Sequence, residues 1–173
     1  MILSQGKIKY LRSLEQKKIR KEENKIVLDG RRLIDEAINN NIMIDHIWLS
    51  NTINGNDSLI KKIKKNKIDF SFEGDKQIKK IRNTKNTQGI IALLSIDKLY
   101  NNDLNNFGNK VLVLDNISDP GNLGTIIRTC SWFGIHSIIL TENSADVFNY
   151  KCVRSSVGGH FFIKNITYLD YDK

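Results

Sequence analysis

The sequence predicts an α/β protein in two parts, a small N-terminal α/β/α sandwich and a C-terminal part built on a parallel sheet. Short β-type runs alternate with helical patterns along most of the 173 residues, as in sheets that carry helices on both faces. The formal net charge is +8, but residues 1–95 hold 20 Lys and Arg against 11 Asp and Glu, whereas residues 96–173 hold 7 and 8. We therefore expect a basic domain at 1–95, a linker at 96–109 and a second domain at 110–173.

The basic half begins with a predicted amphipathic helix over residues 7–24, in which Ile8, Leu11 and Leu14 recur at helical spacing and lysines and arginines occupy the other faces. The elements predicted after it are a strand at 25–29, a turn at 30–32, a helix at 33–39, a strand at 42–49, a helix at 57–65, a strand at 68–72, a helix at 75–81 and a strand at 89–94. An excess of positive charge on a small α/β domain indicates a nucleic-acid partner, because phosphates attract clustered Lys and Arg.

A polar, Asn-rich stretch at 96–109 has no long apolar period and reads as the linker. Beyond it, the apolar run Val111–Leu114 predicts a buried parallel strand. A polar loop follows, and then a helix with Asn122 as its N-cap that runs toward Phe133 and ends at Gly134. The remaining predictions are a strand at 137–140, a helix at 149–157 and a third strand at 161–163.

The strand, loop and helix between Val111 and Gly134 form the strongest candidate for a ligand site. Backbone N–H groups and the positive end of the helix converge outside the carboxyl end of a strand, which is where open α/β sheets bind ligands. Arg128 brings a long cation close to this edge of the sheet. From the pattern alone, the alternative is an ordinary exposed arginine.

Cys130 and Cys152 lack metal-ligand spacing and lie in predicted helices among apolar neighbours, so we expect two buried free thiols and no metal site. His160 follows two glycines with no triad pattern near it, and a packed structural histidine is the preferred interpretation. No signal peptide and no apolar run of about 18 residues is visible. These features favour a cytoplasmic protein.

The helix-forming segment and its loop carry a motif that resembles the first signature of the SpoU/TrmH branch of the SPOUT methyltransferases. The motif reads Asn116-x-x-Asp119-Pro120-x-Asn122-x-Gly124-x-x-x-Arg128-Thr129. Fixed residue types at fixed offsets in a strand–loop–helix context are more specific than a glycine pattern alone. The resemblance implies transfer of a methyl group from S-adenosylmethionine to a ribose 2′-hydroxyl of rRNA or tRNA, by a homodimer and without a metal.

Within that resemblance, Arg128 and Asn122 are the implied catalytic residues, and Asn116, Asp119 and Gly124 are implied to shape the loop. Arginine is almost never deprotonated in proteins. We therefore expect Arg128 to position the neighbouring phosphate and stabilise developing oxyanion charge rather than act as the base. Arg154 matches the family pattern and is an implied RNA contact.

The N-terminal half resembles the substrate-binding domain that precedes the catalytic domain in many SpoU/TrmH enzymes, a domain similar to small RNA-binding ribosomal proteins. Matching segments begin at Lys9, Val27 and Thr87. The resemblance implies that Lys9, Arg12, Arg31 and Arg32 contact the RNA backbone, which gives affinity with little sequence choice.

The resemblance stops at Lys173, just after the predicted third strand. Family members continue with two further motifs that form a C-terminal trefoil knot and hold the cofactor. We therefore expect the first half of a SPOUT domain without its knot, and cofactor-binding residues beyond Lys173.

Two other functions remain open at this stage. One is a non-catalytic RNA-binding or assembly protein derived from the same family. The other is a nucleotide-binding α/β domain that uses residues 120–124 as a phosphate turn and Glu142 as a ribose ligand. The second alternative leaves Arg128 without a role.

Overall fold

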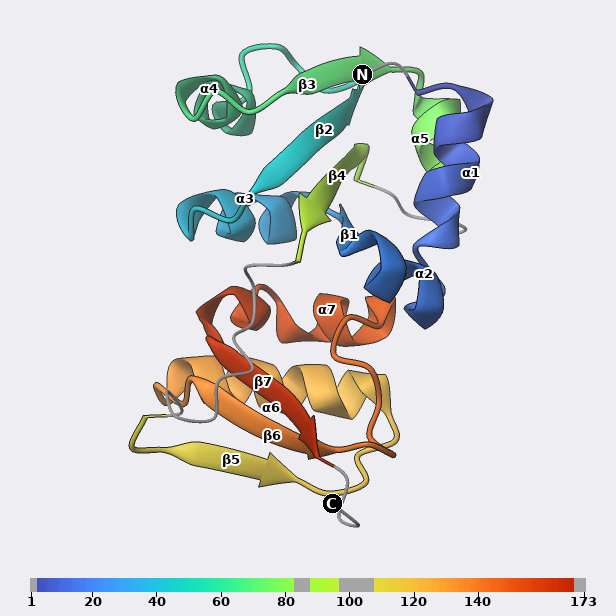
Figure 1. Cartoon of the computed structure of the whole chain (residues 1–173). Coiled ribbons are helices and arrows are strands. Elements are labelled where there is room, and N and C mark those ends of the chain that lie inside the picture. The colour runs from blue at the N-terminus through green and yellow to red at the C-terminus, as the bar shows by residue number, and fades with distance from the viewer. Residues whose placement is uncertain (1–2, 83–87, 97–107, 170–173) are drawn as a thin grey trace. The chain divides into compact units, whose positions relative to one another are not determined.

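A computed structural model of the chain describes residues 3–82, 88–96 and 108–169 (Figure 1). The chain divides into two compact units, residues 1–95 and 96–173. Most of the predicted linker, residues 97–107, lies outside the described residues. No helix in the described ranges is long and apolar enough to cross a bilayer.

The first unit is a four-stranded sheet with helices on both faces. The strands lie in the order β1-β4-β2-β3, and β4 runs antiparallel to both of its neighbours while β2 and β3 are parallel. Its elements are α1 (Gln5–Ser13), α2 (Lys17–Glu23), β1 (Lys25–Asp29), α3 (Arg31–Asn39), β2 (Ile44–Ser50), α4 (Ser58–Lys65), β3 (Phe70–Glu73), α5 (Asp75–Ile81) and β4 (Ile90–Ser95).

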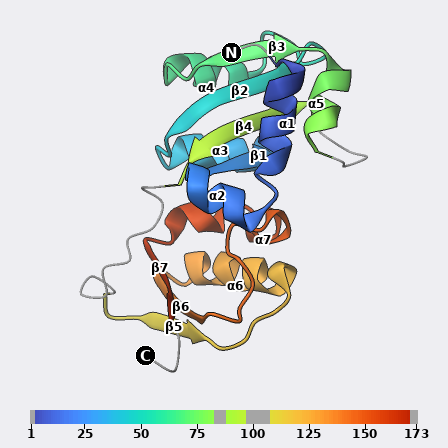
Figure 2. The same cartoon turned by 45° about the vertical axis from the view of Figure 1, so that its right-hand side comes forward.

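One face of this sheet is covered by α1, α2 and α5, and the other by α3 and α4 (Figure 1, Figure 2). On the first face, Trp48 of β2 is fully buried in an apolar cluster with Leu11 of α1 and Ile78 of α5. On the other face, Ile34 of α3 and Ile60 and Ile63 of α4 are buried. The predicted α/β/α sandwich therefore forms around one continuous sheet.

The single helix predicted over residues 7–24 is wrong at its centre, where the structure has two helices separated by residues 14–16. Arg20 of α2 is buried and donates from Nη1 to the carbonyl oxygens of Leu14 (2.8 Å) and Glu15 (2.6 Å). These bonds satisfy carbonyl groups at the end of α1, which would otherwise lack partners. Hydrophobic spacing could not reveal this break, because the pattern continues through it.

The second unit is a three-stranded parallel sheet in the order β5-β6-β7. Its elements are β5 (Val111–Leu114), α6 (Pro120–Trp132), β6 (Ser137–Thr141), α7 (Tyr150–Ser156), the 3-10 helix η2 (Gly159–Phe162) and β7 (Asn165–Leu169). One apolar cluster joins Ile127 of α6, Cys152 of α7 and Ile138 of β6. A mixed α/β fold with a parallel sheet was predicted and is confirmed.

The third strand of this unit does not lie at 161–163, as predicted from the apolar run, but at Asn165–Leu169. Gly158 adopts φ 92° and accepts a backbone hydrogen bond from Phe161, so the chain turns into η2 instead of extending. The backbone N–H groups of Lys164 and Asn165 then bond to the carbonyl of His136, which sets the register of β7 against β6.

Candidate functional site

The loop between β5 and α6 is held by side chains at the end of β6. Asn116 adopts a left-handed conformation with φ 51°, which asparagine tolerates better than most residues. Its backbone N–H donates to Thr141 Oγ1 at 2.9 Å, and the N–H of Ile117 donates to Ser144 Oγ at 3.2 Å. Asn116 therefore takes part in shaping the loop through its backbone, and the hydroxyls of Thr141 and Ser144 were not identified from the sequence.

Helix α6 begins at Pro120 and is capped by Asp119, not by Asn122 as predicted. Asp119 Oδ1 accepts a hydrogen bond from the backbone N–H of Asn122 at 2.8 Å. Proline is well suited to the first helical position because it has no N–H to satisfy, and aspartate is among the strongest N-caps. The loop-shaping role of Asp119 stays a prediction, and this capping bond places its carboxylate at the end of the loop.

Asp119 also pairs with Lys151 in the first turn of α7, with 2.6 Å between Lys151 Nζ and Asp119 Oδ2. The hydrogen bond from Lys151, followed by the one from the Asn122 backbone, lowers the pKa of Asp119. The carboxylate is thus kept charged at the N-terminus of α6, where negative charge is favourable. Sequence reasoning missed Lys151 because no local motif links it to Asp119.

Gly124, which the resemblance implies to shape the loop, lies inside α6, as the helix predicted from Asn122 places it, and is buried. A Cβ atom there would come within 2.3 Å of the Cys152 carbonyl oxygen and 2.7 Å of Ser155 Cβ. Gly159 makes a similar approach on η2, where a Cβ would lie 2.9 Å from Arg128 Cα. These glycines allow α7 and η2 to pack directly against the backbone of α6.

Arg128 and Asn122, the two predicted catalytic residues, are both exposed on α6. They are six positions apart, which on an α-helix amounts to about 9 Å along the axis and about 120° around it. They therefore do not share one face of the helix. Arg154 is exposed on α7 and donates to Tyr150 Oη at 3.3 Å.

His160 is a buried structural residue, in agreement with its predicted role. Its Nε2 lies 2.6 Å from the carbonyl oxygen of Val147, and its Nδ1 lies 2.6 Å from Ser156 Oγ. Because a carbonyl can only accept, Nε2 carries the proton, and the single proton of the Ser156 hydroxyl is shared between Nδ1 and the carbonyl oxygen of Val153, 2.8 Å from Oγ. Burial lowers the pKa of His160 to about 4, so the ring is neutral at physiological pH.

The two cysteines are buried free thiols, as predicted. Burial raises the pKa of Cys130, and it raises that of Cys152 to about 12. Thiols with raised pKa values are poor nucleophiles and poor metal ligands. Across the described ranges, no group of three or more His, Cys, Asp or Glu residues is placed to hold a metal ion.

The predicted RNA contacts of the first unit lie on two helices. Lys9 and Arg12 are exposed on α1, whereas Arg31 and Arg32 are exposed on α3, which covers the opposite face of the sheet. Arg31 is engaged by Asp57, with both terminal nitrogens 2.5 Å from the carboxylate oxygens. The structure thus does not gather these four residues into one patch.

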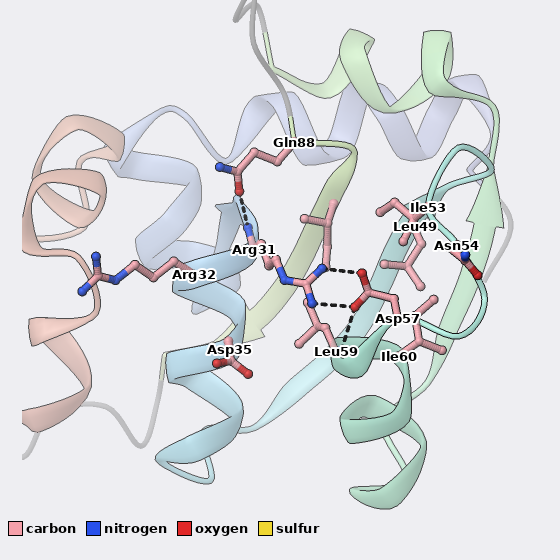
Figure 3. Close-up of a pocket in the computed structure, with 11 residues that line it drawn as sticks. Arg31, Arg32, Asp35, Leu49, Ile53, Asn54, Asp57, Leu59, Ile60 and Gln88 are labelled. Carbon is pink, nitrogen blue, oxygen red and sulfur yellow. Dashed lines mark hydrogen bonds and ion pairs between the residues drawn. The ribbon is translucent and has the colours of Figure 1, made fainter.

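A pocket of about 540 Å³ opens beside Arg31 (Figure 3). It lies between the start of α3, the start of α4 and the adjoining ends of β2 and β4. Its floor is apolar and its rim carries arginine and amide side chains. In Figure 3, Arg31 extends across the pocket toward Asp57, while Arg32 extends away from this pair. No local motif predicts this pocket, because its lining comes from separate segments.

Comparison with known proteins identifies both units. Residues 109–173 match the SpoU rRNA Methylase family, and residues 5–92 match the MRM3-like substrate binding domain. The chain belongs to the SpoU/TrmH family. Among SpoU/TrmH relatives, it is 30% identical over 159 residues to the 23S rRNA (guanosine(2553)-2′-O)-methyltransferase RlmP of Bacillus subtilis, covering 91% of this chain and 60% of the relative. It is also 30% identical to mitochondrial rRNA methyltransferase 3 of Xenopus laevis, covering 91% of this chain and 38% of the relative.

Solved SpoU/TrmH structures have the same fold. An rRNA methyltransferase from Sinorhizobium meliloti superposes with a TM-score of 0.80 at 27% identity, over 99% of this chain and 64% of that protein. The AdoMet-bound form of an rRNA methyltransferase from the same organism superposes with a TM-score of 0.79 over 99% of this chain and 65% of that one. The chain thus spans less than two thirds of the length of these relatives.

Proposed function

We propose that the chain acts in the transfer of a methyl group from S-adenosylmethionine to a ribose 2′-hydroxyl of rRNA or tRNA. The observation that carries this proposal is the combination of a basic unit that matches a substrate-binding domain with a SpoU unit whose first motif is intact. A family relative named as a 2′-O-methyltransferase of 23S rRNA supports ribosomal RNA as the substrate class.

In this proposal, Arg128 acts on the RNA at the reacting ribose. Its side chain is exposed and makes no hydrogen bond or ion pair with the residues that the structure describes. A guanidinium presents a planar fork that matches phosphate oxygens and cannot serve as a base at neutral pH. Arg128 therefore holds the adjacent phosphate and stabilises negative charge that develops on the 2′-oxygen.

The helix N-terminus supplies the supporting geometry. Asp119 fixes the start of α6, and Asn122, whose backbone N–H donates to Asp119, has an exposed side-chain amide that is proposed to contact the RNA from a different face of the helix than Arg128. When bound, S-adenosylmethionine supplies an electrophilic methyl group. None of the described residues is assigned to the methyl donor.

The first unit is proposed to hold the RNA through its phosphates. Residues 1–95 carry nine more positive than negative side chains, and Lys9, Arg12 and Arg32 are exposed. Binding of this type weakens steeply with salt because counterions are released from the RNA. In the second unit, exposed Arg154 is proposed as a further phosphate contact. Assembly as a homodimer through the methyltransferase domain, in the cytoplasm, is part of the same proposal.

The proposal is tested by deleting the gene and mapping 2′-O-methylated nucleotides in rRNA and tRNA by mass spectrometry. We expect one modified nucleotide to disappear and to return when the gene is restored. An unchanged methylation map would refute methyl transfer. If the purified protein nevertheless bound RNA, the result would favour the non-catalytic RNA-binding function.

A further inference from the structure

The pocket beside Arg31 has a floor made of buried aliphatic side chains. Leu49, Leu59, Ile60 and Ile90 line it, and each is less than 5% exposed. Its volume of about 540 Å³ falls within the range of small-molecule sites, about 300–1,000 Å³. An apolar floor of this size suits a flat ring better than a phosphate group, because a buried phosphate charge is costly without polar partners.

The rim of the pocket carries two side-chain amides whose orientation is fixed. Gln88 Oε1 accepts the backbone N–H of Arg31 at 2.7 Å, and Asn54 Oδ1 accepts the backbone N–H of Asn56 at 3.0 Å. Because each oxygen faces a backbone donor, each NH₂ group is left to donate elsewhere. No acceptor for either NH₂ group is recorded within the described ranges. The rim therefore offers donors to a ligand with carbonyl or ring-nitrogen acceptors.

Arg31 adds a rigid planar wall. Its guanidinium is held by the bidentate pair with Asp57 and donates to Ser58 Oγ at 3.1 Å, yet the side chain remains 46% exposed. Asp57 is itself fixed, since it caps α4 through the N–H of Leu59 at 2.8 Å. A guanidinium immobilised in this way offers a face on which a nucleobase can stack.

We propose that this pocket takes the base of an unpaired nucleotide in an RNA chain. The proposal rests on the proposed function, in which the first unit binds RNA, and it adds a preference for RNA with an extruded base. The positive charge of the unit favours a polyanion, and exposed Arg32 at the rim is available to the backbone of the same strand. A free mononucleotide shares the ring chemistry but lacks the flanking phosphates.

The test compares the affinity of the full chain for two RNA duplexes of equal length, one fully paired and one with a single bulged nucleotide, by fluorescence anisotropy at fixed salt. Uridine and adenosine monophosphates form the third arm. We expect the bulged RNA to bind at least about tenfold more tightly than the paired RNA, the effect of one stacked base. We expect mononucleotides to bind far more weakly than either.

Two variants connect this preference to the pocket. Asn54→Asp keeps the oxygen that holds the Asn56 N–H but removes the NH₂ donor, and Ile53→Trp fills the pocket from a half-buried position. Ile53→Trp is expected to abolish the tenfold preference because it blocks the stacking site, and Asn54→Asp is expected to reduce it because one of the two rim donors is lost. Asn56→Asp is the matched control, since it places the same charge at an exposed position in the same loop outside the pocket lining, and it should lower both affinities equally.

A direct readout is the side-chain NH₂ resonances of Asn54 and Gln88, which should shift in ¹⁵N spectra with bulged RNA and not with paired RNA. Equal binding of the two RNAs, or a preference that survives both pocket variants, would overturn the pocket proposal and leave RNA binding intact. Failure of the chain to bind either RNA would instead overturn the RNA-binding role on which it rests. Tighter binding of mononucleotides than of bulged RNA would identify a free nucleotide as the ligand and refute an RNA site.

Discussion

Asp119 and Lys151 connect the two helices that carry the candidate site. The carboxylate of Asp119 caps α6 through one oxygen and pairs with Lys151 of α7 through the other, at 2.8 Å from the Asn122 nitrogen and 2.6 Å from Lys151 Nζ. A single side chain thereby caps the helix that carries Arg128 and pairs with the first turn of α7.

The cap and the ion pair can be separated by substitution. Asp119→Ala removes both and should lower the melting temperature most, because lost N-caps are consistently destabilising. Asp119→Asn keeps an oxygen for the cap and loses only the charge, and Lys151→Met loses the same charge interaction from the other side. These two substitutions should lower the melting temperature only slightly, since an ion pair between exposed side chains contributes little to stability. Equal losses for Asp119→Ala and Asp119→Asn would show that the cap contributes nothing.

A second prediction concerns the contact at Gly124. Gly124→Ala would place a methyl group 2.3 Å from the Cys152 carbonyl oxygen, and we expect it to lower the free energy of unfolding by about 1–3 kcal/mol. This loss should occur although alanine favours helices by roughly 1 kcal/mol over glycine. Urea denaturation measures the change.

Gly6→Ala is the matched control for this change. Gly6 is an exposed helical glycine in α1, and a Cβ there would meet nothing closer than 3.9 Å. This variant should be neutral or slightly stabilising. If Gly124→Ala behaved in the same way as Gly6→Ala, α6 and α7 would not pack as closely as the structure shows.

A third prediction concerns pH. Burial lowers the pKa of His160 from 6.5 to about 4, so between these values the unfolded chain binds a proton that the folded chain excludes. The stabilising contribution of neutral His160 is complete above pH 6.5 and is lost progressively as the pH falls toward 4. The shift corresponds to about 3 kcal/mol at most.

An NMR titration of the His160 ring tests this prediction directly. His46 also has a pKa lowered by burial, and it would add to any global loss of stability in the same pH range. Residue-specific resonances separate the two histidines. A His160 pKa near 6.5 would contradict the buried, neutral ring.

Much of the fold followed from local patterns, because apolar spacing and turn residues act over short distances. Helix α5 at Asp75–Ile81 and strand β5 at Val111–Leu114 begin and end where these patterns place them. The burial predicted for β5 is wrong, because it is an edge strand in which Val111 and Val113 are exposed. The break between α1 and α2 could not be predicted in this way. It depends on the buried guanidinium of Arg20 reaching carbonyl groups in the preceding turn.

The motif of the candidate site could be predicted from the sequence, but the partners of its residues could not. The residues of the motif identified the loop and helix, while the partners that hold them come from elsewhere in the chain. Thr141 lies 25 positions and Lys151 lies 32 positions from their partners Asn116 and Asp119. The family motif implied a loop-shaping role for Gly124, whereas the structure shows that it allows close packing between α6 and α7.

The last prediction concerns Arg128, the residue on which the proposed chemistry depends. Because its side chain is exposed and has no recorded partner among the described residues, Arg128→Ala should change the free energy of unfolding by no more than about 0.5 kcal/mol. Methylation should nevertheless fall by about 100-fold or more, as it does when one donor to a developing oxyanion is removed. Arg128→Lys keeps the charge and loses the planar fork, so it should also be severely impaired.

Each variant is introduced into the chromosomal gene, and the modified nucleotide is quantified by mass spectrometry of total RNA. Lys164→Ala, at an exposed cation outside the motif, serves as the control and should leave methylation unchanged. Undiminished methylation in Arg128→Lys would rule out bidentate phosphate contact and leave only a role for positive charge. Undiminished methylation in Arg128→Ala would remove Arg128 from the reaction, whereas the stability measurement excludes unfolding as the cause of a loss in either variant.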